Sequence, residues 1–114
     1  MLSALEYAPP GFNEQRYVGH QFIELSHEGR PYAYAAARAV GSDCALHLQM
    51  VRFDHKVLRH LLVRDWPTFK RAAREEGVSR FYVSNAEPDD KWRRFIALLG
   101  FPAPETVAVS SMEV

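Results

Sequence analysis

The sequence has a single cysteine and few glycines, and both shortages limit the kinds of site that it can build. Cys44, as the only cysteine among 114 residues, excludes an internal disulfide and a cysteine-rich zinc site. None of the six glycines lies between Ser42 and Glu76. Backbone loops that cradle phosphate groups need glycine for the close approach. This middle stretch therefore offers no such loop.

Long hydrophobic runs and a net charge are also missing. Apolar residues make up 47% of the chain, but no run approaches the roughly 20 residues of a membrane span. The first residues, Met1 to Glu6, lack the basic and apolar regions of a signal peptide. We therefore expect one packed domain over residues 1–114, with a cytoplasmic location.

The charges nevertheless divide unevenly along the chain, although their formal sum is zero. Acidic residues dominate the first 29 positions, and basic residues dominate positions 52–80. The acidic set is Glu6, Glu14, Glu24 and Glu28, and the basic set includes Arg52, Lys56, Arg59 and Arg64. Such asymmetry favours a protein partner or a homo-oligomer. Nucleic acid is a weaker alternative, because the chain is neutral and carries no recognisable binding motif.

Period-2 patterns predict strands in the first half of the chain. Residues 1–7 form at most a short strand, because Pro9 and Pro10 break the chain soon afterwards. Three further strands are expected at residues 20–26, 31–38 and 44–52, separated by a four-residue turn at 27–30 and a turn at 41–43. Three consecutive antiparallel strands form a meander.

From Asp54 the period becomes helical and continues to Gly77. Pro67 predicts either a kinked helix or two helices, the second one capped by Asp65. A strand at 80–84 follows, then a helix capped by Asp89 or Asp90 and closed by Gly100, and a last strand at 106–110. Trp92, Phe95, Ile96 and Leu99 should be buried on that helix, and Leu62 and Phe69 should face the sheet from the long one. The order βββ-α-β-α-β predicts the α+β class.

This order of elements resembles the C-terminal half of the GNAT acetyltransferase superfamily. The resemblance runs from about His20 to Ser110 and is most specific where Asn85 is followed by a helix ending in Leu99-Gly100-Phe101. It implies a mixed, mostly antiparallel sheet with helices on its faces. It also implies that residues 1–19 are a shortened N-terminal region, and that an active member would use acetyl-CoA.

Two departures from the GNAT pattern argue against activity. GNAT enzymes hold the pyrophosphate of coenzyme A in a glycine-containing loop before the long helix, where this chain reads Gln49 to Leu58 without glycine and with Asp54. Many also carry a proton-donating tyrosine four residues before the glycine of the Gly-Phe pair, where this chain has Ile96. An enzyme of this family would have to use other residues. The resemblance places Gln49, Met50, Val51, Arg52 and Lys56 at the pyrophosphate, Asn85 near the pantetheine and Tyr82 as an acid.

The sequence therefore favours a non-catalytic GNAT-like structural or interaction protein without catalytic residues or a cofactor. Compact GNAT-like proteins of this kind resemble those encoded by tailed bacteriophages, which suggests a virion component. Two alternatives remain open, a divergent acetyl-CoA-dependent N-acetyltransferase and a small phage-encoded inhibitor of a host protein.

Two further groups of residues bear on sites and partners. The five histidines show none of the spacings typical of zinc ligands on one helix face, so no metal site is expected. Tyr7, Phe12 and Tyr17 either anchor a partner or fold back on the domain itself.

Overall fold

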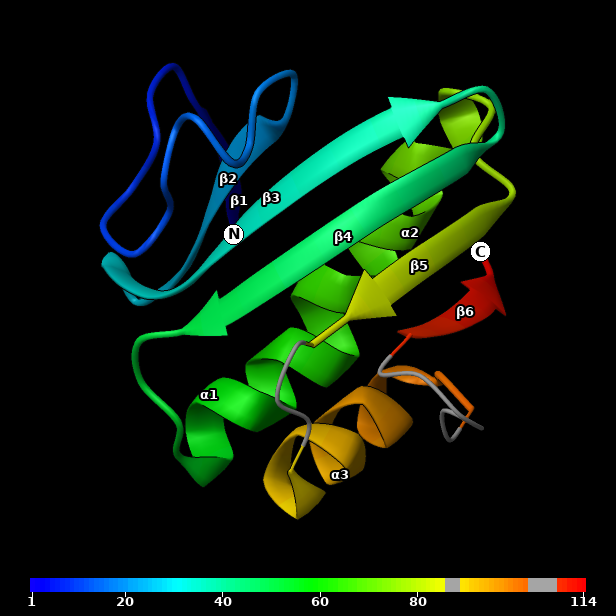
Figure 1. Cartoon of the computed structure of the whole chain (residues 1–114). Coiled ribbons are helices and arrows are strands. Elements are labelled where there is room, and N and C mark those ends of the chain that lie inside the picture. The colour runs from blue at the N-terminus through cyan, green and yellow to red at the C-terminus, as the bar shows by residue number, and fades with distance from the viewer. Residues whose placement is uncertain (86–88, 103–108) are drawn as a thin grey trace.

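A computed structural model describes residues 1–85, 89–102 and 109–114 (Figure 1). The strands are β1 (Leu2–Leu5), β2 (Gln21–His27), β3 (Arg30–Val40), β4 (Asp43–Met50), β5 (Arg80–Ser84) and β6 (Val109–Glu113). The helices are α1 (His55–His60), the π-helical segment η1 (Leu61–Asp65), α2 (Trp66–Glu75) and α3 (Asp90–Leu99).

All six strands form one sheet in chain order. Every neighbouring pair is antiparallel except β4 and β5, which are parallel. The predicted α+β fold with a mixed, mostly antiparallel sheet is therefore confirmed. Of the predicted last strand at 106–110, residues 109 and 110 belong to β6, and the first three predicted residues lie outside the described part of the chain.

The turn between β2 and β3 is tighter than the sequence predicts. The strands pair as far as His27 and Arg30, so only Glu28 and Gly29 connect them. Both have positive φ, 55° and 74°, as in the primed turns that match the twist of a hairpin.

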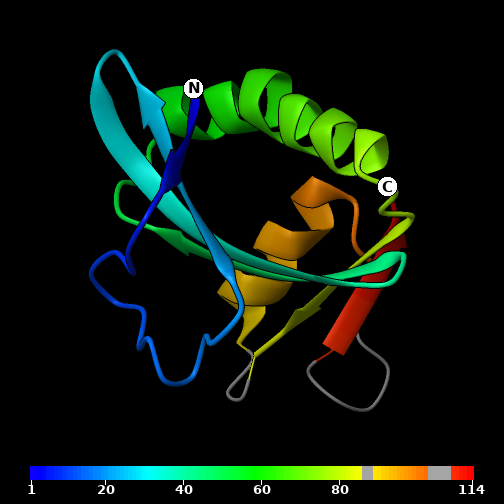
Figure 2. The same cartoon turned by 90° about the horizontal axis from the view of Figure 1, so that it is seen from above.

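The long helical stretch runs without interruption from α1 through η1 into α2 and covers one face of the sheet (Figure 2). Asp54 caps its start, since its carboxylate accepts the N–H of Val57. Pro67 has no N–H to donate to the preceding turn, and the π-helical segment ends at Asp65, with only Trp66 between them. The predicted cap by Asp65 is wrong, because this residue is helical and makes no capping hydrogen bond.

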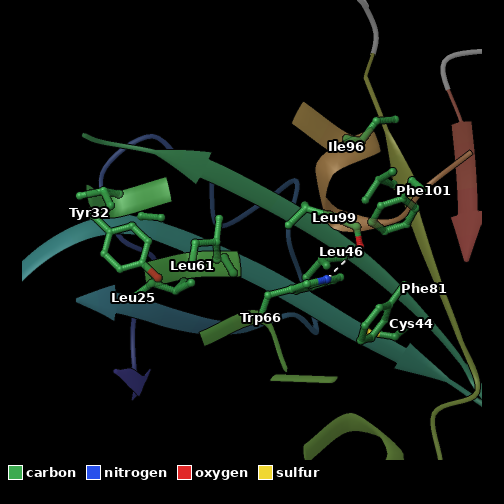
Figure 3. Packing of buried hydrophobic residues seen from close by; sticks show 14 of the residues in the cluster. Leu25, Tyr32, Cys44, Leu46, Leu61, Trp66, Phe81, Ile96, Leu99 and Phe101 are labelled. Atoms are coloured by element: carbon green, nitrogen blue, oxygen red, sulfur yellow. Dashed lines mark hydrogen bonds between the residues drawn. The ribbon is translucent and has the colours of Figure 1, made fainter. Parts of the chain in front are cut away.

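The core lies between the sheet and this helical stretch, and α3 closes one end of it (Figure 3). Trp66 occupies its centre and donates from Nε1 to the carbonyl oxygen of Leu99 at 2.9 Å. Ile96 and Leu99 of α3 are buried as predicted. Trp92 and Phe95 are only half-buried, because their side chains line the surface cleft described below. Leu62 and Phe69 are also half-buried and pack on the core.

Asp65 does not cap a helix but points into the protein, where it is 4% exposed. Its carboxylate accepts the hydroxyl of Tyr32 at 2.5 Å and the α-amino group of Met1 at 2.7 Å. His60 Nε2 lies 3.2 Å from the same carboxylate. Burial, followed by the hydrogen bond to Asp65 and its charge, raises the pKa of the Tyr32 phenol. This cluster joins the helical stretch to β3.

The segment between β1 and β2 folds back over the face of the sheet that the long helix leaves uncovered (Figure 2). Phe12 packs edge-on against Phe22 of β2, and Tyr17 packs edge-on against His47 of β4. Tyr7 is 68% exposed. Two of the three candidate anchors therefore serve the domain itself. Among the described helices, none is long and apolar enough to cross a membrane.

Candidate functional site

The two parallel strands separate soon after they meet. Pairing between β4 and β5 covers Asp43 with Arg80, Cys44 with Phe81, and Ala45 with Tyr82. Beyond this point, both strands continue without a partner for their facing edges in the described part of the chain, β4 to Met50 and β5 to Ser84. The sheet therefore has an opening at the carboxyl ends of these strands (Figure 1).

A cleft of about 200 Å³ lies at this opening, and we call it the β4–β5 cleft. Its walls come from four parts of the chain: β4, the end of β5, α3, and the segment between β1 and β2. The residues that line it are Gly11, Phe12, Tyr17, Leu46, His47, Leu48, Gln49, Val83, Ser84, Asn85, Trp92, Phe95, Ile96 and Leu99. Apolar walls with a few polar groups are typical of ligand sites.

The segment between β1 and β2 forms one wall because a glycine lets it approach β4 closely. Gly11 has φ of 92°, and a Cβ atom there would lie 2.4 Å from Oε1 of Gln49. Any other residue would push the segment away from the strand or displace the Gln49 side chain. Phe12 and Tyr17 complete the same wall.

His47 stands where the cleft meets a second hollow on the same face of the sheet. It lines the β4–β5 cleft and also this hollow, which Tyr82, Arg38 and His20 share. Its ring lies 5.0 Å from that of Tyr17 and 5.9 Å from that of His20. Burial, with the charges of His20 and Arg16 adding to it, lowers the pKa of His47. His47 is therefore a neutral imidazole at pH 7, able to accept a proton.

The titration of His47 can be measured directly. We expect its Cε1–H resonance, assigned by comparison with His47→Gln, to titrate below the value of about 6.5 found in unfolded peptides. Because the folded-state pKa is lowered, the associated stability is present above about pH 6.5 and is lost as the pH falls through the folded pKa. The free energy of unfolding should therefore fall less between pH 7 and pH 5 in His47→Gln. A midpoint at or above the peptide value would contradict the buried neutral ring.

The backbone donors expected at a pyrophosphate are already engaged. The N–H groups of Val51 and Arg52 both donate to the carbonyl oxygen of Tyr32, at 2.7 and 3.1 Å. Met50 lies within β4, in register with Ala33. Gln49 contributes its side chain to the cleft, and Met50 lines an adjoining groove beside Asn85.

The first turn of α1 is closed by its own cap. Asp54 Oδ1 accepts the N–H of Val57 at 2.9 Å. That hydrogen bond, with the charges of Arg52 and Lys56 adding to it, lowers the pKa of Asp54, so its carboxylate is ionised at neutral pH. Arg52 has one buried nitrogen, Nε, without a hydrogen-bond partner in the described residues. This region does not fit the diphosphate of coenzyme A.

Of the other residues selected from the sequence, Asn85 lies in the cleft and Tyr82 does not. Tyr82 lies on the opposite face of β5 from the buried Phe81 and Val83, in the hollow with His47. Ile96 lines the cleft and carries no proton donor. The sequence named Tyr17 only as a candidate anchor and did not select His47. Each lies in an ordinary local pattern and reaches the cleft only through folding.

Comparison with known proteins finds likeness in structure alone. No protein-family model matches this sequence, and neither does any curated protein. The structure is similar to the ribosomal-protein-S18-alanine N-acetyltransferase from Escherichia coli, with a TM-score of 0.64 and 16% identity over 100% of this chain and 93% of that one. It is also similar to the PaiA N-acetyltransferase from Thermoplasma acidophilum in complex with coenzyme A, with a TM-score of 0.65 and 11% identity over 89% of this chain and 65% of that one.

An aminoglycoside acetyltransferase in complex with coenzyme A is similar as well, with a TM-score of 0.65 and 9% identity over 86% of this chain and 68% of that one. All three neighbours are acetyltransferases. At these identities the likeness establishes the architecture and nothing finer. The chain has the fold of the GNAT acetyltransferases.

Proposed function

We propose that this chain binds an extended acyl-thioester donor in the β4–β5 cleft and acts as a divergent N-acyltransferase. The observation that carries the proposal is the separation of β4 and β5 beyond Ala45 and Tyr82. Strand edges without a partner pair readily with an extended chain that carries amide groups. The pantetheine arm of acetyl-CoA is such a chain, and its amides can use the edges of both strands.

Two residues that line the cleft, His47 and Tyr17, suit the transfer of protons. A bound thioester supplies the activated acyl group. Neutral His47 accepts the proton that an amine loses as its nitrogen forms the new amide bond. Tyr17 is the phenol that lines the cleft, and we assign to it, in place of Tyr82, the proton that the departing sulfur takes up as its bond to the acyl carbon breaks.

Calorimetric titration with acetyl-CoA tests the proposal when the chain is compared with a variant whose cleft is filled by a larger side chain. Ser84 is exposed and lines the cleft, so Ser84→Phe should abolish binding by occupying the space of the donor. Ser79→Phe is the matched control, because Ser79 is also exposed and precedes β5. Weak saturable binding that is lost only in Ser84→Phe is expected. No binding, or binding that Ser84→Phe leaves intact, would remove the proposed donor site.

A second candidate is a non-catalytic interaction protein that holds a peptide segment of a partner in the same cleft. The capped start of α1 and the aliphatic Ile96 favour it. In this case acetyl-CoA would not bind, and an extended peptide would protect the amides of β4 and β5 from hydrogen exchange. A virion component or a phage-encoded inhibitor would be a special form of this candidate, and the three neighbours named above lend neither any support.

A further inference from the structure

We infer that the donor is recognised through its thioester-bearing arm alone, and that the diphosphate and nucleotide of coenzyme A contribute no binding energy. This inference rests on the proposed donor site in the β4–β5 cleft and concerns which part of the donor that site binds. It arises from a contrast between two parts of the expected donor site. The cleft is open, while the place where the fold would hold a diphosphate is closed in two independent ways.

The first closure is the loss of backbone donors. Val51 and Arg52 direct their N–H groups to one carbonyl oxygen, that of Tyr32 in β3. A diphosphate would have to break both hydrogen bonds and leave that carbonyl without its partners, at a cost that its own contacts would first have to repay. With no glycine between Ser42 and Glu76, the chain has no position there at which a phosphate can approach the backbone closely.

The second closure is electrostatic. The ionised Asp54 occupies the first turn of α1, where it accepts the N–H of Val57 at 2.9 Å. Arg52 and Lys56 help to lower the pKa of Asp54, so its carboxylate stays ionised. The unpartnered Nε of Arg52 is buried, out of reach of a phosphate in solvent. An incoming diphosphate therefore meets an ionised carboxylate at the first turn of α1.

The chain provides its own control for the cap. Asp89 caps α3 through the N–H of Trp92 at 2.8 Å, with φ −116° and ψ 175°. Asp54 caps α1 with φ −129° and ψ 173°. The two caps are matched in chemistry and geometry, but only Asp54 lies between the end of β4 and the long helix. Changing either residue to asparagine removes one charge and keeps a good cap.

Titrations with acetyl-CoA and with S-acetylpantetheine, which lacks the diphosphate and nucleotide, test the inference. We expect dissociation constants within about threefold of each other, since even one charge-assisted hydrogen bond to phosphate would separate them by about tenfold or more. Asp54→Asn should tighten acetyl-CoA by about threefold through the loss of repulsion, and it should leave S-acetylpantetheine unchanged. Asp89→Asn should change neither.

The possible outcomes separate this inference from the proposed function. Tighter binding of acetyl-CoA by tenfold or more would overturn the inference and leave the donor site standing. Equal changes for both ligands in Asp54→Asn would also overturn it, because Asp54 would then act on the arm. Failure of both ligands to bind would remove the donor site and the inference with it. Equal binding, with a response to Asp54→Asn for acetyl-CoA alone, supports both.

Discussion

Trp66→Ala should lower the free energy of unfolding by about 3–5 kcal/mol, the range found when a large buried aromatic side chain is deleted. Trp66 is 6% exposed. Its ring stacks on Phe69 at 5.9 Å and lies 5.4 Å from Phe81 and 6.3 Å from Phe101. The substitution also leaves the carbonyl oxygen of Leu99 without the Nε1 donor. One side chain thus joins α2, β5 and the end of α3.

Urea denaturation followed by circular dichroism measures this effect, and the second tryptophan is the control. Trp92 is only half-buried, so Trp92→Ala should cost clearly less than Trp66→Ala. Trp66→Phe should fall between the two, because it keeps most of the buried area and loses the hydrogen bond. If Trp92→Ala were as costly as Trp66→Ala, the centre of the core would lie nearer to α3 than described.

Asp65→Ala should destabilise the protein by about 3 kcal/mol, because it leaves the groups that now bond to its buried carboxylate without a partner. The hydroxyl of Tyr32 would lose its acceptor within the core. Asp54→Ala is the comparison, since it removes a carboxylate of the same type from an exposed cap and should cost clearly less. Similar costs for the two variants would show that Asp65 does not serve a buried network.

Tyr32→Phe completes a double-mutant cycle with Asp65→Ala. The two losses should not add, because both variants remove the same hydrogen bond.

The raised pKa of Tyr32 makes the free energy of unfolding depend on pH. The contribution of this residue to stability is fully present below about pH 10 and declines as the pH rises through the folded-state pKa. Tyr32→Phe should therefore lose less stability than the parent chain in alkaline solution.

Much of the fold follows from local signals in the sequence. The change from period 2 to a helical period at Asp54 separates the meander from the long helix, and Asp89, one of the two predicted caps, does cap α3. Gly77 and Gly100 end their helices with positive φ, 89° and 105°. Each of these features depends on residues close together in the chain, so a single sequence carries enough information to place them.

The cleft itself could not be predicted in this way. The point at which β4 and β5 separate depends on the pairing of two strands that are far apart in the sequence, with the long helix between them. His47 and Tyr17 meet only because the segment between β1 and β2 folds back over the sheet. Trp66 and Trp92 both occupy apolar positions of helical patterns, and only the tertiary packing decides that Trp66 is enclosed while Trp92 lines a surface.

The single parallel pair in the sheet also bears on the order in which the chain folds. The strands from β1 to β4 join neighbours along the chain, so their pairing closes short loops. Pairing of β4 with β5 encloses all of α1, η1 and α2 in one loop and yields three residue pairs in return. Closing a long loop costs more conformational entropy than closing a short one, and contacts between distant segments slow folding. The meander is therefore expected to assemble first, and the parallel pairing of β4 with β5 is expected to form last.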